Sequence, residues 1–578
     1  MTLRDHLRPS ALFGDSALGT TARSAAQGLS SAAVSGVSRM SSHIGVDPDM
    51  VPGPRGGLPP EELTAAHWGN GSRRVIDPIG WFEHQKGIDE LQKSFDAIPS
   101  EAQVRLAKKT SNLFRSRTAT KTPGLNVEGL GRVIAVDTKA QTADVQGMCT
   151  YENLVDTKAQ TADVQGMCTY ENLVDTLLPF GFAPYVVPEL KTITLGGAIT
   201  GMGVESSCFR NGLPHESVIE MDILTGTGDI VTCSPVENVD LFRAYPNSYG
   251  SLGYAVRIKI KIEKIKPFVE LRHVRFHDLT SIAAAIDSIV SSHEYDGEPV
   301  DYLDGVVFSP TEGYLVLGRQ SSDVPPRVSD YTGEHIYYRS LQHPEGTTRD
   351  TLTMHDYLWR WDTDWFWCSR AFGAQNPTIR RMWPAGLLRS SFYWKIVGAD
   401  KRWDLADRIE AHHGRPARER VVQDVEVTTD KVPEFLEWFF QASEIQPVWL
   451  CPIKLAEESS SLTTRGNVLS SDVALADGAG SHPWPLYPLS VGDVWVNIGF
   501  WSSAPVDLTD DPQPGAFNRV IERKIRDLGG HKSLYSEAFY SKEEFSALYG
   551  GSIPELVKNI YDPNHRFPGL FDKAVGGK

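Results

Sequence analysis

Two glycine-rich segments have residue types and spacing suited to holding a large polar ligand. They lie within residues 188–232 and 245–265, each next to a stretch rich in β-formers. Glycine permits a positive φ and lets backbone N–H groups approach a ligand closely. The pattern therefore predicts a cofactor-facing segment, and its glycines are Gly196, Gly197, Gly201, Gly203, Gly250 and Gly253.

The first segment has a glycine spacing superficially like that of a Rossmann phosphate loop. A Rossmann loop follows a strand and opens a helix. Here the glycines run into polar turns and then a hydrophobic strand predicted over residues 218–224. A glycine-rich turn in an ordinary β protein is the alternative interpretation. The second segment precedes a predicted strand in which Val256, Ile258, Ile260 and Ile262 alternate with charged residues.

Taken together, the two segments resemble the flavin domain of the vanillyl-alcohol oxidase and p-cresol methylhydroxylase (PCMH) superfamily. Within it, the chain resembles the Δ24-sterol reductase family from about residue 75 to the C-terminus. The sequence segments that resemble this family are VPEL, LGG, GVESS, NGLPHES, ENVDLFRA and GSLGY, followed much later by VVQD, PVWLCP and LYSEAFYSKEEF.

The resemblance implies an α+β fold: a two-subdomain FAD-binding PCMH-type domain over residues 74–265, then an α+β cap or substrate domain over 266–578. The C-terminal segment is expected to return to the flavin domain. Residues 1–73 are rich in Ser, Ala, Gly and Pro and are predicted to be a disordered tail, with a transit peptide or a misassigned start before Met40 as alternatives.

The resemblance also implies FAD as cofactor. The glycine-rich, histidine-bearing form of the pyrophosphate loop is missing, so the flavin is expected to be non-covalent. By their position in the chain, the candidates to bind the FAD pyrophosphate are Lys109, Thr110, Ser111, Asn112 and Arg115. The remaining FAD candidates are the six glycines above with Pro188, Glu189, Thr194, Ser206 and Ser207.

For activity, the resemblance implies a reductase of a lipid C=C bond. It is closest to the actinobacterial branch that reduces a 10-methylene fatty-acyl chain to the 10-methyl chain after a methyltransferase has acted. NADPH is the expected transient donor, since no nicotinamide Rossmann unit is visible. A sterol side-chain reductase and an oxidase of an alcohol or sugar acid are the rival activities. A flavin-empty, non-catalytic protein is the rival from another class.

An isolated alkene accepts hydride poorly, so the expected path protonates it first and needs a desolvated acid near an apolar channel. The candidates for this acid each also have a structural interpretation, as a turn partner, a cap or a core residue. Asp424 and Lys454 are weaker candidates. The acid candidates are Glu205, His215, Tyr535, Glu537 and Tyr540.

A perfect tandem repeat interrupts the predicted flavin domain. The letters VDTKAQTADVQGMCTYENL start at Val136 and again at Val155, so the unit is 155 − 136 = 19 residues long. One copy makes sense as a hairpin followed by a helix. A packed domain has one place for this unit, so the surplus copy should loop out or compete for it. Reduced stability or flavin occupancy is the expected consequence.

Four tryptophans lie close together at Trp359, Trp361, Trp365 and Trp367. One interpretation is a core helix that places Tyr357, Trp361 and Trp365 on one face. The other is an apolar wall or interfacial patch for a lipid, because Trp combines a large apolar body with one polar atom.

Composition limits the classes of partner. The chain has 578 residues and a formal net charge of −16, which argues against nucleic acid as the main partner. Its six cysteines form no CxxC pair and no metal-ligand spacing. No run of 18 apolar residues predicts a membrane span. A cytoplasmic protein is expected, with peripheral contact at the inner face of the membrane as the alternative.

Overall fold

The computed structural model describes residues 77–106, 124–147, 169–331, 335–344, 346–372, 374–384, 387–403, 416–469, 471, 478–509 and 515–575. The predicted tail, the pyrophosphate candidates Lys109, Thr110, Ser111, Asn112 and Arg115, and residues 148–168 of the repeat lie outside these ranges. Helices and antiparallel sheets form two sheet-based units, as expected for the predicted α+β fold.

A six-stranded antiparallel sheet forms the first unit, in the order β1-β2-β6-β4-β5 with β3 beside β6. The predicted alternation over 256–262 is confirmed, because Val256, Ile258, Ile260 and Ile262 are all buried. The strands are β1 (Val133–Asp137), β2 (Thr142–Gln146), β3 (Phe182–Pro184), β4 (Val218–Leu224), β5 (Ile230–Cys233) and β6 (Tyr254–Lys264).

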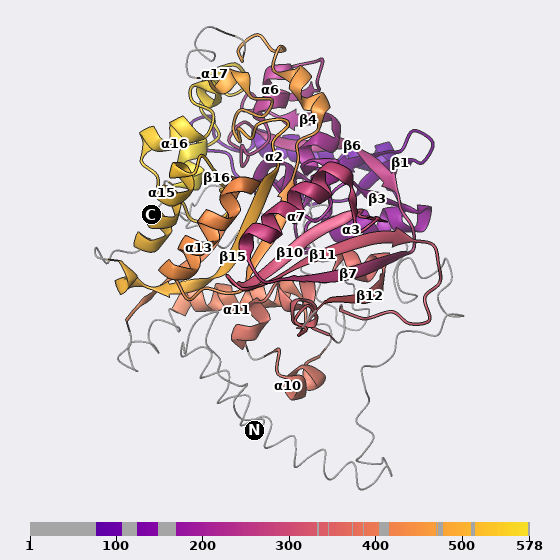
Figure 1. Cartoon of the computed structure of the whole chain (residues 1–578). Helices are drawn as coiled ribbons and strands as arrows, with labels where there is room; N and C mark the ends of the chain where they lie inside the picture. The colour runs from indigo at the N-terminus through magenta and orange to yellow at the C-terminus, as the bar shows by residue number, and fades with distance from the viewer. Residues whose placement is uncertain are drawn as a thin grey trace.

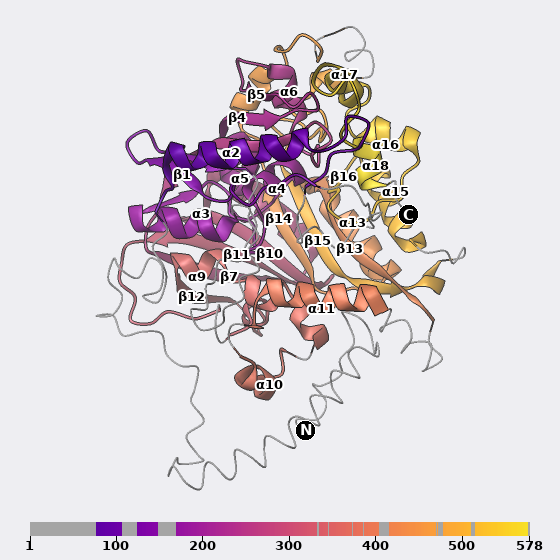
Figure 2. The ribbon, with the colours of Figure 1, turned by 180° about the vertical axis from the view of Figure 1, so that it is seen from behind.

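Two helices cover this sheet on the side seen in Figure 2. The sequence spacing of Ile88, Leu91 and Phe95 predicts a helix with one apolar face. The structure confirms it, because all three are buried in α2 (Gly80–Asp96). In α3 (Tyr170–Leu177) Thr169 is the N-cap, and its side chain accepts a hydrogen bond from Asn172 N. The alternative interpretation of the first glycine segment, a glycine-rich turn, is wrong for residues 195–201. These residues form a short helix, α4 (Leu195–Gly201), capped by Thr194.

The described part of the repeat is shared between its two copies. The β1–β2 hairpin comes from the first copy and α3 begins in the second. The flanks explain this choice. The helix α3 ends with Leu177, which is fully buried. If the first copy formed this helix instead, the corresponding residue would be Lys158. The strand β1 begins with Val133, which is buried. If the second copy formed this hairpin instead, the corresponding residue would be Glu152. The other assignment would bury a charge in each case.

An eight-stranded antiparallel sheet forms the second unit, in the order β12-β7-β11-β10-β14-β15-β13-β16. One face is packed by α7 (Leu279–Ser292), α13 (Val432–Ala442) and α15 (Ala516–Asp527), as Figure 1 shows. The strands are β7 (Phe268–Phe276), β10 (Tyr302–Ser309), β11 (Glu312–Ser321), β12 (Thr347–Thr353), β13 (Arg418–Thr428), β14 (Val448–Ile453), β15 (Trp495–Pro505) and β16 (His531–Lys532).

The four clustered tryptophans do not form one helix. After α9 (Met354–Leu358) the chain makes 3-10 turns over Asp362–Asp364 and Cys368–Phe372, and Trp365 and Phe366 have positive φ. All four tryptophan side chains are buried, so an interfacial patch made by them is wrong. They lie inside the protein, beside the second sheet.

The C-terminal segment packs against the first unit. Its helices are α16 (Lys542–Leu548), α17 (Ile553–Tyr561) and α18 (Leu570–Ala574). The sequence spacing of Ser541 and Glu544 predicts a capping box at the start of α16, and the structure confirms it. Arg566 donates hydrogen bonds to the carbonyls of Ile98 and Ala102, and Lys558 contacts the carbonyl of Ser251. The alternation of Tyr535, Glu537 and Phe539 with smaller residues predicts a strand over 534–540, but these residues form none, so that prediction is wrong.

Candidate functional site

The face of the second sheet turned away from α7, α13 and α15 carries several polar residues. Strand alternation places Leu303, Val425 and Ile498 in the core beneath those helices. Their sequence neighbours therefore point to the opposite face, toward the first unit. These neighbours are Asp304 on β10, Asp424 and Glu426 on β13, and Asn497 on β15.

Arg360 joins the two units through a buried ion-pair cluster. Its Nη2 donates to Glu205 Oε1 at 2.6 Å and to Asp304 Oδ2 at 2.9 Å. Trp449 Nε1 donates to the same Asp304 oxygen at 3.2 Å. The guanidinium lies 4.2 Å from the ring centroid of Tyr357, which adds a cation–π contact. A charge-assisted network of this kind fixes the position of Glu205 relative to the second sheet.

Glu205 is held at the end of the first glycine segment. The C-cap of α4, Met202, has a left-handed φ of 59° and turns the chain toward it. The carboxylate of Glu205 accepts a hydrogen bond from Ser206 N at 2.8 Å. Burial raises the pKa of Glu205, while Arg360 opposes that rise.

Two further carboxyl groups lie near this cluster. Burial raises the pKa of Glu189 well above its usual value, and the charges of Glu205 and Asp424 raise it further. Burial raises the pKa of Asp424 to about 6, against hydrogen bonds from Tyr535 and Asn497 that lower it. Trp501 Nε1 in turn donates to the Tyr535 hydroxyl at 2.8 Å.

Glu205 and Asp304 share the guanidinium of Arg360, which among the described residues is the cation paired with both. Glu189 lies within electrostatic reach of Glu205 and Asp424, so that four carboxyl groups form one set. Burial raises the pKa values of Glu189, Glu205 and Asp424, which favours their protonated forms. The set is therefore a candidate proton source.

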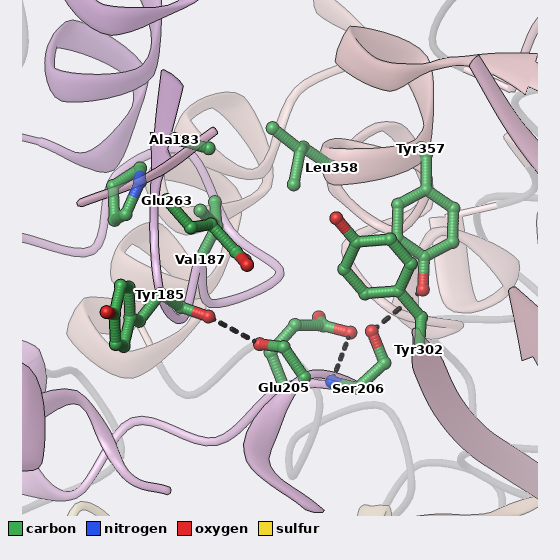
Figure 3. Close-up of a pocket in the computed structure, with 11 residues that line it drawn as sticks. Ala183, Tyr185, Val187, Glu205, Ser206, Glu263, Tyr302, Tyr357 and Leu358 are labelled. Atoms are coloured by element: carbon green, nitrogen blue, oxygen red, sulfur yellow. Dashed lines mark hydrogen bonds between the residues drawn. The ribbon is translucent and has the colours of Figure 1, made fainter. Parts of the chain in front are cut away.

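A small pocket opens beside Glu205 at the boundary of the two units (Figure 3). It encloses about 270 Å³ of unfilled space, part of it solvent. Ser206 Oγ and the Tyr357 hydroxyl are 2.8 Å apart at its wall, and Ser207 Oγ donates to Tyr185 O. The hydroxyls of Ser206 and Ser207, predicted to contact FAD, are thus engaged with protein groups around this pocket.

The structure brings the two glycine segments together. Tyr249 N donates to the carbonyl of Thr200 in α4 at 3.1 Å. A Cβ on Gly196 would collide with the carbonyl of Gly147, so this glycine is needed for close approach of the backbone. Gly250 and Gly253 have positive φ, as the predicted role of glycine requires, whereas Gly197, Gly201 and Gly203 do not.

The loop before β6 has the chemistry expected of an FAD cradle. The side-chain oxygens of Asn247, Ser248 and Ser251 are buried and have no hydrogen-bond partner within the described residues. Such groups cost free energy unless a ligand or water pairs with them. FAD offers hydroxyl, phosphate and ring-nitrogen partners, so these residues and the N-terminal turn of α4 fit it.

Of the five predicted acids, the structure brings Glu205 and Tyr535 to the carboxyl cluster. His215 lies elsewhere, with its ring 4.5 Å from that of Trp484, and burial lowers its pKa to about 3. Tyr540 packs on Tyr549 and Phe545 beside the C-terminal helices. The backbone carbonyl of Glu537 accepts a hydrogen bond from Lys532.

Four members of the cluster have other sequence assignments or none. Asp424 was a weaker candidate, and Glu189 was assigned to FAD. Arg360 and Asp304 were not predicted. A usable signal exists for Asp304, a carboxylate within a strand that is otherwise largely apolar, YLDGVVFS.

Comparison with known proteins agrees with this architecture. An FAD binding domain family matches residues 151–234. The Δ24-sterol reductase of Homo sapiens is 25% identical over 450 residues, covering 76% of this chain and 75% of that protein. The Δ24-sterol reductase of Arabidopsis thaliana is 26% identical over 427 residues, covering 69% and 71%. Cytokinin dehydrogenase 9 of Oryza sativa is 31% identical over 159 residues, covering 27% and 30%.

Among the described residues, no helix has the length and apolar character to cross a bilayer. The FAD-domain match includes the first glycine segment and stops before the loop that carries the unpaired oxygens. The chain is an FAD-dependent oxidoreductase with a PCMH-type FAD-binding domain, related to the Δ24-sterol reductases.

Proposed function

We propose that the protein reduces a carbon–carbon double bond of a lipid, namely a 10-methylene fatty-acyl chain to the 10-methyl chain, with NADPH as donor. The observation that carries the proposal is the set of four carboxyl groups at this site: Glu205 and Asp304, buried and paired with Arg360, and the half-buried Glu189 and Asp424 beside them. Relatives named Δ24-sterol reductases support the reductive direction. Bound FAD in its reduced form supplies the hydride.

The residues of the chain supply the proton and the apolar surroundings. An isolated alkene has no carbonyl to take up charge, so proton donation by a desolvated acid lowers the barrier. Asp424, with a pKa of about 6, can hold a proton near neutral pH and can also release it. Trp449 and Trp501 lie on the same face of the second sheet and exclude water from this region.

Arg360 positions the set rather than donating a proton. Its pKa is raised further by the buried carboxylates around it, so it stays charged. The proton donor must then be a carboxyl group that is not directly paired with it. Among the described residues, Glu189 and Asp424 meet this condition, since Arg360 pairs with Glu205 and Asp304.

The test begins with the purified protein under anaerobic conditions. We expect flavin absorbance that bleaches with NADPH and returns when a 10-methylene lipid is added, with the 10-methyl product found by mass spectrometry. In the Asp424→Asn variant, NADPH should bleach the flavin absorbance normally, but the absorbance should return slowly when the lipid is added. Asp430→Asn, an exposed residue just beyond β13, is the matched control and should behave like the unaltered protein.

The names of the relatives favour one alternative substrate, a sterol side chain with a Δ24 double bond. Recovery of flavin absorbance with such a sterol and not with the 10-methylene lipid would replace the first substrate by the second. Hydrogen peroxide formed from an alcohol without any consumption of NADPH would overturn both and indicate an oxidase.

A further inference from the structure

Helix α10 (Pro377–Met382) and the turn after it form an exposed apolar surface. Figures 1 and 2 both show α10 projecting from the body of the protein. Met382 is 48% exposed and Leu387 is 38% exposed, and Arg381 and Pro384 are exposed beside them. Trp383 is half-buried between these side chains. We call Arg381, Met382, Trp383, Pro384 and Leu387 the α10 surface.

The α10 surface carries one cation, Arg381, and no acidic residue, in a protein whose formal net charge is −16. Arg380 and Arg389 are in ion pairs with Asp364 and Glu171, so they hold the surface in place. Arg381 is exposed next to Met382. Basic and apolar side chains together suit the interface of an anionic bilayer.

Aromatic side chains connect the α10 surface to the carboxyl cluster. Trp383 contacts Phe392 on α11 (Ser390–Trp403), with ring centroids 6.1 Å apart. Behind them, Tyr393 stacks on Trp365 at 5.9 Å, and Trp365 contacts Trp501 at 6.2 Å. Trp501 then donates its indole N–H to Tyr535, the neighbour of Asp424.

We propose that the α10 surface docks on an anionic phospholipid membrane. Met382, Trp383 and Leu387 enter the interfacial region, while Arg381 contacts lipid phosphate. The docking stands independently of the proposed function. The buried tryptophans behind the surface support it from inside the protein and do not touch the bilayer themselves.

The test measures co-sedimentation of the full-length protein with vesicles of phosphatidylcholine alone or mixed with phosphatidylglycerol. The unaltered protein should bind the mixed vesicles more tightly, and added salt should weaken that binding. Met382→Ser with Leu387→Ser should weaken it at least tenfold, because two apolar side chains lose their burial. Arg381→Glu should weaken binding to the mixed vesicles about tenfold.

Ile560→Ser is the matched control, since Ile560 is 49% exposed and its helix, α17, lies far from α10 in Figures 1 and 2. It should leave vesicle binding unchanged. The proposal is overturned if the unaltered protein fails to bind mixed vesicles at low salt, or if the double variant binds as tightly. Because vesicle binding needs no substrate, that result would leave the proposed reductase activity standing.

Discussion

Asp424 and Gly499 are directly paired partners on β13 and β15, and no side chain larger than that of glycine fits between them. A Cβ on Gly499 would collide with Asp424 Oδ1 and lie 3.3 Å from the Trp449 ring. The glycine therefore gives the carboxyl group its place on the sheet. A residue of the apolar strand β15 thus takes part in positioning the proposed proton donor.

Gly499→Ala should displace the Asp424 side chain without disturbing the strands. We expect kcat for lipid reduction to fall about tenfold or more, since misplacing a reacting group by 1 Å is costly. Flavin content should stay unchanged. Gly569→Ala is the control, because its added Cβ would meet Asp572 at 3.3 Å, far from the cluster. Equal kcat values for both variants would contradict the positioning role.

Arg360→Met should strongly destabilise the protein, because it leaves Glu205 and Asp304 buried without a counter-ion. Loss of one partner of a buried pair costs about 3–5 kcal/mol. Combining it with Glu205→Gln and Asp304→Asn should recover much of that loss. Urea unfolding followed by fluorescence measures both. A combined variant less stable than Arg360→Met alone would rule out charge imbalance as the cause.

Glu426 predicts a pH dependence of stability. Burial raises its pKa to about 8, while the Tyr487 hydroxyl, which donates to it, opposes the rise. A raised folded-state pKa gives stability that is present below the unfolded value and lost as pH rises through 8. Relative to Glu426→Gln, the unaltered protein should lose roughly 3–5 kcal/mol between pH 4 and 8.

Thermal unfolding midpoints of the two proteins across that range provide the measurement. The exposed Glu543→Gln serves as the control and should follow the unaltered protein at every pH. Parallel curves for Glu426→Gln and the unaltered protein would show that this carboxyl group is not the source of the pH dependence.

Deleting residues 148–166 removes one copy of the repeat and should leave the fold intact. Gly147 lies against Gly196, and Thr169 bridges to Thr194, so the ends to be joined contact the same short segment. Two residues, Met167 and Cys168, would then link them. We expect equal or higher flavin content and an equal or higher Tm. Loss of bound flavin would mean that the second copy contributes to the cofactor domain.

Local pattern predicted much of the fold. Period-two alternation gave β6, helical spacing gave α2 and a capping box gave α16, because each depends on residues close in sequence. The helix α4 was missed because glycine is a poor helix former. Contacts with Gly147 and Tyr249, which are distant in sequence, favour the helical form. Tertiary packing outweighed local propensity there.

The carboxyl cluster could be predicted only in part. Glu205 and Tyr535 came from a resemblance, but Glu205, Asp304 and Arg360 meet only because β10 and α9 lie beside the end of α4. Nothing in the local sequence around Arg360 indicates its partners 155 and 56 residues away. Such a site depends on strand order, which one sequence does not reveal.

The return of the C-terminal segment makes the cofactor domain discontinuous in the chain. Asp562 fills the space beside Gly226, and Arg566 donates a hydrogen bond to the carbonyl of Ile98. Lys573 donates to the carbonyls of Tyr249 and Gly250, in the loop before β6 that fits FAD. During synthesis on the ribosome, these partners emerge long after the loop that they contact, because 324 residues separate Lys573 from Tyr249. Completion of the flavin cradle therefore waits for residues 562–573, and a truncation that removes them would act first on cofactor retention.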